Sequence, residues 1–240
     1  MSLLRSLLFS TPLIILSTVV MWTCSVACSL FDPSGNSQHR MAQIWGRMLL
    51  AASLIRVRVE GLENLDGPGP YVFVSNHASL MDIPAILAYL PYQFRFFAKK
   101  ALYTVPFVGW HLKRAGHIPV DRANARASLR SMSEGARMVA EHGLSVLLFP
   151  EGGRAPQGLR EFKEGAAYIA IKAGVPLAPM ALSGMRELLP MGSIHLRSGR
   201  VTLRVGKPIP TAGLTLHDRE QLTARLYDEI AAMLKVGAAV

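Results

Sequence analysis

The stretch "YVFVSNHASLMDIP", Tyr71–Pro84, joins a short apolar run to a polar turn and then to the first residues of a helix. Its first part, "YVFVS", is a continuous run of mostly β-branched and aromatic residues, which is typical of a strand buried on both faces. The turn places His77 and Asp82 five residues apart, just beyond that strand. A buried strand that ends in a histidine and an acid indicates an α/β protein with a polar site at one edge of its sheet.

Strand and helix patterns alternate along the rest of the chain after residue 55. Further strands are predicted at "IRVRVEG" (55–61), "FRFFA" (94–98), "GHIPV" (116–120), "SVLLF" (145–149), "VPLAPMAL" (175–182) and "RVTLRVG" (200–206). Helices are predicted at 83–90, 124–142 and 165–173 and at the C-terminus. This order predicts an α/β fold with a mixed, largely parallel sheet flanked by helices. In the helix 124–142, the apolar stripe expected to face the core consists of Ala125, Leu129, Met132, Ala136 and Val139.

The first 55 residues have a different character. Residues 7–31 contain no charge, and this run is longer than the roughly 20 residues that a membrane-spanning helix needs. It also exceeds the apolar core of about 7–15 residues found in a cleaved signal peptide, so we expect it to stay in the mature protein. Residues 41–55 form an amphipathic segment with Trp45 near arginines, which suits a membrane interface.

We therefore expect residues 1–55 to form membrane-anchoring helices and residues 56–240 to form the main domain. The turn "DPSGNSQ" (32–38) separates the two helices. Two geometries remain open: a single span, or a helical hairpin that enters one leaflet. In the first case the positive-inside tendency places the main domain on the cytoplasmic side, and the hairpin keeps it there too. The alternative is that both helices belong to the core.

The composition supports an anionic environment for this protein. Half of the residues are hydrophobic and only 18% are charged, yet the formal net charge is +10. High apolarity indicates a membrane, and the basic excess indicates a lipid surface or a phosphorylated substrate. No stretch interleaves aromatic and basic residues as nucleic-acid-binding segments do. The two cysteines, Cys24 and Cys28, lie in the apolar run, and the sequence has no metal-ligand spacing, P-loop or dinucleotide fingerprint.

Polar residues follow three of the predicted strands. Because the carboxyl ends of parallel strands meet at one edge of a sheet, these residues are expected to converge on one crevice. They are Asn76, His77, Asp121, Arg122, Glu151, Gly152, Gly153 and Arg154.

Four segments resemble the ordered motif blocks of the glycerolipid acyltransferases that carry the N-H-x4-D motif, in the lysophosphatidic acid acyltransferase branch. The segments are "NHASLMD" (76–82), "GHIPVDR" (116–122), "FPEGGR" (149–154) and "VPLAPMAL" (175–182). The resemblance covers about residues 57–206 and includes a lysine-rich segment, "FAKKALYTVPFVGW" (97–110). Two positions depart from the family pattern: Gly153 stands where a threonine is usual, and Ala101 where a glutamate is usual.

The resemblance implies a membrane-bound enzyme that moves a fatty acyl group from acyl-CoA or acyl carrier protein to the sn-2 hydroxyl of 1-acylglycerol 3-phosphate, forming phosphatidic acid. No metal and no other cofactor is expected. The expected partners are membrane lipids, the lyso-phospholipid acceptor and the acyl donor, and no nucleic acid. The expected location is the inner (plasma) membrane, with the catalytic domain on the cytoplasmic side. Alternatives are another acceptor such as lyso-ornithine lipid, a thioesterase, or a non-catalytic lipid-binding relative.

His77 is predicted to be the catalytic base, and Asp82 is predicted to hold its tautomer and stabilise the imidazolium. Taken alone, Asp82 could be a helix N-cap and His77 a turn residue. Ser79 would be a nucleophile only if an acyl-enzyme formed, and is otherwise a turn hydroxyl. Glu151 is expected to hold an arginine or a substrate hydroxyl. The predicted substrate-binding residues are Asn76, Lys99, Lys100, Arg122, Glu151, Gly152, Gly153 and Arg154.

Overall fold

The computed structural model describes residues 2–237. Within this range seven strands form one sheet in the order β1-β7-β6-β2-β5-β3-β4. Every neighbouring pair is parallel except β6 and β7, which run antiparallel. The predicted mixed, largely parallel sheet is therefore confirmed. The strands are β1 (Ile55–Glu60), β2 (Val72–Ser75), β3 (Phe94–Lys99), β4 (Ile118–Val120), β5 (Ser145–Leu148), β6 (Leu177–Ser183) and β7 (Gly199–Val205).

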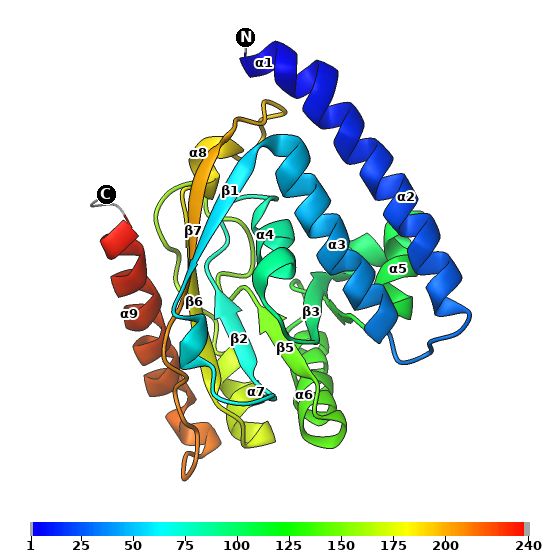
Figure 1. Ribbon diagram of the computed structural model, residues 1–240. Coiled ribbons are helices and arrows are strands. Elements are labelled where there is room, and N and C mark those ends of the chain that lie inside the picture. Colours follow the sequence, from blue (N-terminus) through cyan, green and yellow to red (C-terminus); the bar gives the residue numbers. More distant parts are fainter. Residues whose placement is uncertain (1, 238–240) are drawn as a thin grey trace.

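Helices cover both faces of the sheet (Figure 1). The α-helices are α1 (Ser2–Arg5), α2 (Thr11–Ser29), α3 (Asn36–Ser53), α4 (Asp82–Tyr89), α5 (Val108–Arg114), α6 (Ala125–His142), α7 (Gly165–Ala173), α8 (Met185–Leu188) and α9 (Arg219–Gly237). Short turns of other helix types are η1 (Ser6–Ser10), η2 (Leu62–Asn64), η3 (Lys100–Thr104) and η4 (Leu216–Asp218).

Two apolar cores hold these layers together, one on each face of the sheet. One core joins the sheet to α3 and α4, and contains Leu49, Ile86, Phe73 and Phe94. The other joins the opposite face to α6, α7 and α9 through Val139, Ile169, Ile230 and others. Strands β2 and β5 are buried along their whole length, as expected for the middle of a sheet covered on both sides.

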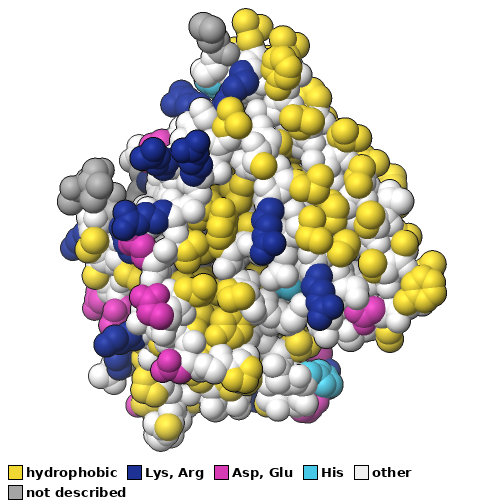
Figure 2. Space-filling view, viewed as in Figure 1, with side chains coloured by type: hydrophobic (Ala, Val, Ile, Leu, Met, Phe, Trp, Pro, Cys, Tyr) yellow, Lys and Arg dark blue, Asp and Glu magenta, His cyan; other side chains and the backbone are white. Residues whose placement is uncertain are grey.

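The N-terminal helices lie outside the α3–α4 layer. Elements α1, η1 and α2 follow one another without a break from Ser2 to Ser29. This helix is long and apolar enough to cross a membrane, and only 17% of its most apolar window is buried in the protein. Helix α2 packs on α3, which in turn packs on α4. Figure 2 shows hydrophobic side chains gathered along the edge of the molecule where α1 and α2 run in Figure 1.

The turn between α2 and α3 is shorter than the sequence predicts, because α3 already begins at Asn36. The Asp32 carboxylate accepts hydrogen bonds from the backbone N–H groups of Ser34 and Ser37 at 2.9 and 2.7 Å. The buried guanidinium of Arg95 on β3 donates to the Ser34 carbonyl at 3.0 Å and to the Asn36 side chain at 2.9 Å. The tip of the helical pair is therefore bonded directly to the sheet.

The predicted core stripe of α6 is wrong at Ala125, which is exposed, and at Leu129, which is 53% exposed, although Ala136 and Val139 are buried. The helix is rotated so that Met132 and Gly135 face the sheet. A Cβ atom built at Gly135 would lie 2.3 Å from the ring of Phe97 on β3, so the glycine is what allows α6 to lie this close. This rotation moves Leu129 to the side of the helix and into solvent.

Candidate active site

His77 stands in the loop that follows β2, and its ring is held from one side by the first residue of α4. The Nδ1 atom lies 2.8 Å from Oδ2 of Asp82. An ionised carboxylate can only accept, so Nδ1 carries the proton and Nε2 presents its lone pair. The His77 side chain is 12% exposed. The arrangement is that of a general base whose tautomer is fixed by an acid.

The Asp82 carboxylate also holds the loop itself. Its Oδ2 atom accepts the backbone N–H groups of Ala78 and Ser79 at 2.7 and 2.8 Å. The residue is 1% exposed and stands at the N-terminal end of α4. The helix N-cap role that the sequence offers as the alternative for Asp82 is not what the structure shows: α4 begins at Asp82 itself, Met81 holds the N-cap position, and the carboxylate bonds to residues before the helix.

One face of the His77 ring is covered by Phe149, the residue that follows β5. The two ring centroids are 4.1 Å apart and the planes differ by 18°. Phe149 stacks on one face of the ring and Asp82 bonds Nδ1, while no hydrogen bond within residues 2–237 engages Nε2. Phe149 is predicted from the sequence only as the last residue of a strand, so its place in the site is a finding of the structure.

Glu151 is buried under the His77 loop and bonds to main-chain groups. Its Oε1 accepts the His77 N–H at 2.7 Å, and its Oε2 accepts the Arg160 N–H at 3.0 Å. In return, the Ala155 N–H donates to the His77 carbonyl at 2.8 Å. Burial raises the pKa of the Glu151 carboxyl, while the two N–H bonds lower it. Glu151 therefore ties two loops together instead of holding an arginine side chain.

Two of the predicted basic residues lie beside the glycine turn. Gly152 has a φ of +71°, a conformation that side chains disfavour. The Arg122 guanidinium lies 3.6 Å from the position that a Cβ of Gly153 would take. Within residues 2–237 neither Arg122 nor Arg154 is in an ion pair. Both side chains are therefore free of a carboxylate partner in the described part of the chain.

Next to this turn is a cavity of about 140 Å³, whose lining includes Arg122, Phe149, Gly152 and Lys163. The Lys163 ammonium lies 3.3 Å from the position that a Cβ of Gly152 would take. Because Phe149 both lines this cavity and stacks on His77, the cationic pocket adjoins the base. No role for Lys163 is predicted from the sequence, because the residue is separated from β5 by a long loop.

Asn76, Lys99 and Lys100, the remaining predicted substrate-binding residues, lie outside this pocket. The Asn76 amide is used by the sheet: its oxygen accepts the Leu182 N–H at 2.8 Å and its nitrogen donates to the Leu182 carbonyl at 3.0 Å. Lys99 and Lys100 are exposed at the end of β3, and Lys100 is 3.5 Å from Asp121. The Ser79 hydroxyl donates to the Leu189 carbonyl at 2.9 Å, which is the turn role.

A histidine–aspartate pair beside a cationic pocket, at the carboxyl edge of a largely parallel sheet, defines a class of α/β proteins suited to proton transfer next to a bound anion. The chain belongs to the Acyltransferase family, whose model matches residues 56–183.

Individual relatives agree with this assignment. The chain is 35% identical over 184 residues to the chloroplastic 1-acyl-sn-glycerol-3-phosphate acyltransferase LPAT1 of Arabidopsis thaliana, covering 75% of this chain and 51% of that protein. It is 34% identical over 182 residues to the human 1-acyl-sn-glycerol-3-phosphate acyltransferase alpha, covering 75% of this chain and 64% of the relative. The chain thus spans about half the length of the first of these relatives.

A solved structure is similar over the full length. The crystal structure of the 1-acyl-sn-glycerophosphate acyltransferase PlsC from Thermotoga maritima matches with a TM-score of 0.84 and 25% sequence identity. The match covers 100% of this chain and 99% of that one, so it includes the N-terminal helices as well as the sheet.

Proposed function

We propose that this protein is a membrane-bound acyltransferase that moves a fatty acyl group from acyl-CoA or acyl carrier protein to the sn-2 hydroxyl of 1-acylglycerol 3-phosphate. The product is phosphatidic acid. The observation that carries the proposal is the His77 ring, bonded through Nδ1 to Asp82 and stacked on Phe149, which also lines the pocket of Arg122 and Lys163. The names of the relatives support the same reaction.

In the proposed reaction the acceptor hydroxyl gives its proton to Nε2 of His77 as its oxygen attacks the thioester carbonyl carbon. A tetrahedral oxyanion forms, the C–S bond breaks, and the proton passes from the imidazolium to the leaving sulfur. Asp82 stabilises the imidazolium in between. The lipid hydroxyl is the nucleophile, which agrees with the engagement of the Ser79 hydroxyl by a backbone carbonyl. No metal or further cofactor enters the proposal.

The acceptor phosphate is proposed to lie against Arg122, Arg154 and Lys163. Guanidinium groups match phosphate oxygens bidentately, and a pocket beside apolar walls strengthens that attraction. Lys99, Lys100 and the amides of Gly152 and Gly153 are proposed to add to this anion-binding surface. The acyl chains are proposed to lie toward the N-terminal helices, with α1–α2 in the inner membrane and the sheet on the cytoplasmic side.

The test is thiol release by purified protein in detergent, from acyl-CoA and from acyl carrier protein, with and without lysophosphatidic acid. We expect release to depend on the acceptor and to vanish in His77→Ala, while the matched control His217→Ala, on an exposed residue far along the chain, keeps full activity. Arg154→Ala should raise the KM for the acceptor more than Arg154→Lys does. Activity restricted to a phosphate-free acceptor such as lyso-ornithine lipid would refute the substrate, and acceptor-independent release would indicate a thioesterase.

A further inference from the structure

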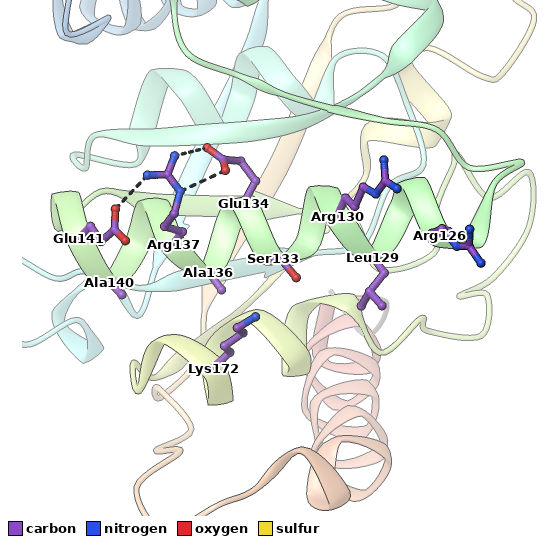
Figure 3. Close-up of a pocket in the computed structure, with 10 residues that line it drawn as sticks. All are labelled: Arg126, Leu129, Arg130, Ser133, Glu134, Ala136, Arg137, Ala140, Glu141 and Lys172. Atoms are coloured by element: carbon purple, nitrogen blue, oxygen red, sulfur yellow. Dashed lines mark hydrogen bonds and ion pairs between the residues drawn. The ribbon is translucent and has the colours of Figure 1, made fainter.

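One face of α6 carries exposed cationic and apolar side chains that do not contribute to the core. Arg126, Leu129, Arg130 and Ser133 are three, four and seven residues apart, so they lie on one side of the helix. Together with Lys172 of α7 they line an open groove of about 620 Å³ (Figure 3). We refer to these five residues as the α6 groove.

The charges at this groove run against the preference of the helix. Arg126 and Arg130 lie in the first two turns of α6, where the helix dipole is positive and acidic residues are favoured; the first turn has none. Within residues 2–237 neither arginine is in an ion pair. Arg137, two turns beyond Arg130 in the lining of the same groove, is bonded to Glu134 and Glu141, which also line it. The unpaired positive charge is thus concentrated at the end of α6 nearer the active site.

An apolar side chain lies between the two arginines. Leu129 is 53% exposed although it is large and hydrophobic. A partly exposed leucine that lines a groove with arginines has the make-up of a protein-binding surface, in which an apolar anchor is ringed by polar groups. Both features together call for a partner that offers carboxylates around an apolar side chain.

The position of the groove favours a soluble partner over a membrane surface. Helix α6 packs on the face of the sheet opposite to α3 and α4, and the apolar α2 lies outside α3. A bilayer that takes up α2 is therefore separated from α6 by the sheet. The same helix also borders the active site, because Ser128 and Met132 line the small cavity that contains Arg122 and Phe149.

We propose that the α6 groove is the docking surface for acyl carrier protein, a small acidic protein that holds the acyl thioester on a flexible arm. This inference rests on the proposed function and selects one route for the donor. Carboxylates on a helix of the carrier pair with Arg126 and Arg130, and an apolar side chain of the same helix packs on Leu129. The arm then passes the N-terminal end of α6 and brings the thioester to His77 beside the cavity, in which the acceptor phosphate is proposed to lie. An acyl-CoA donor reaches His77 without contact with the α6 groove.

The test compares the two donors in the same protein. The full-length protein in detergent is assayed for acyl transfer from acyl carrier protein and from acyl-CoA, as wild type and as the Arg126→Glu/Arg130→Glu variant. A control pair with the same change of charge, Lys207→Glu/Arg225→Glu, alters two exposed residues outside the groove. Leu129→Ala is tested in parallel, and binding of acyl-free carrier protein is measured at two salt concentrations.

We expect the groove variant to lose at least about tenfold in kcat/KM with the carrier donor, because paired charges at a protein interface chiefly set the association rate. With acyl-CoA it should change less than about twofold. Leu129→Ala should weaken carrier binding at both salt concentrations, and the control pair should behave like wild type.

Equal losses with both donors would overturn the docking proposal, as would equal losses in the groove and control pairs. A wild-type protein that uses acyl-CoA but neither uses nor binds the carrier would also overturn it while leaving the proposed function intact. Binding of the groove to anionic phosphatidylglycerol vesicles, lost in the groove variant but not in the control, would assign the surface to lipid instead. Should no donor be used, the proposed function fails, and carrier binding alone decides the docking.

Discussion

Replacement of Asp82 by asparagine probes how the catalytic ring is held. Oδ2 of Asp82 accepts hydrogen bonds from the His77 ring at 2.8 Å and from the N–H groups of Ala78 and Ser79 at 2.7 and 2.8 Å. Two backbone donors at one position require an acceptor there, so the amide oxygen and not the amide nitrogen should occupy it. The bond to Nδ1–H is then kept, and the substitution removes only the negative charge.

The size of the effect follows from that geometry. A hydrogen bond to a charged acceptor is worth about 1.5–3 kcal/mol and a neutral one about 0.5–1.5 kcal/mol. Losing the difference, about 1.5 kcal/mol, lowers the rate about tenfold, and weaker stabilisation of the imidazolium extends the expected loss toward about 100-fold. Asp82→Ala removes the acceptor, leaves two backbone N–H groups without a partner, and should cost about 1000-fold in kcat.

The assay is initial-rate thioester consumption in detergent with lysophosphatidic acid, alongside urea unfolding of each variant. Asp82→Asn should unfold at nearly the wild-type urea concentration, and Asp82→Ala should lose about 3 kcal/mol because both orphaned donors are buried. The reasoning is refuted if Asp82→Asn is as inactive as Asp82→Ala while it remains stable. That result would mean that the amide has turned its nitrogen toward the ring and selected the wrong tautomer.

Three further substitutions test other parts of the structure. Gly135→Ala should destabilise the protein by about 2 kcal/mol in urea unfolding, since the new methyl group meets Phe97 and this clash exceeds the gain in helix propensity; an unchanged stability would refute the close packing of α6. Asn76→Ala should lose about 3 kcal/mol of stability, as both main-chain groups of Leu182 lose their partner, with an unaltered acceptor KM in the folded enzyme; a raised KM would restore Asn76 as a substrate ligand. Burial raises the pKa of Glu151 in the folded protein, so the wild type loses stability as the pH rises from about 4.5 to 7 and the buried carboxyl ionises. Glu151→Gln cannot ionise, so its free energy of unfolding should increase relative to that of the wild type over this range. Urea unfolding at both pH values checks the sign.

The sequence predicts the sheet and its polar edge well because both follow from short-range patterns. A fully apolar run such as "SVLLF" has only the sheet interior to occupy, and the residues just after it must lie at the sheet edge. That logic brings Glu151 next to the His77 loop as predicted. Its partners were not predicted, because they are main-chain N–H groups of residues 77 and 160, and a backbone donor leaves no trace in a sequence.

Errors arise where tertiary packing decides. Leu129 fits the apolar stripe of its helix by periodicity, yet the close approach of Gly135 to Phe97 rotates the helix and exposes it. Asn76 has the polarity of a ligand, but β6 takes both of its amide groups. Lys163 reaches the pocket only through the loop that folds back from Pro150, whose carbonyl accepts the Lys163 N–H at 2.9 Å.

The loop that carries Arg154 forms hydrogen bonds with both the backbone N–H and the backbone carbonyl of His77. Glu151 accepts the His77 N–H, and Ala155 donates to the His77 carbonyl. Arg154 sits between these two attachments, so any pull that a bound phosphate exerts on the arginine is passed to the loop that positions the base. The base is already oriented by Asp82 without a substrate, so the acceptor phosphate and the catalytic ring are held to one short stretch of backbone. A substitution that shifts the Arg154 loop should therefore disturb the position of His77 as well as phosphate binding.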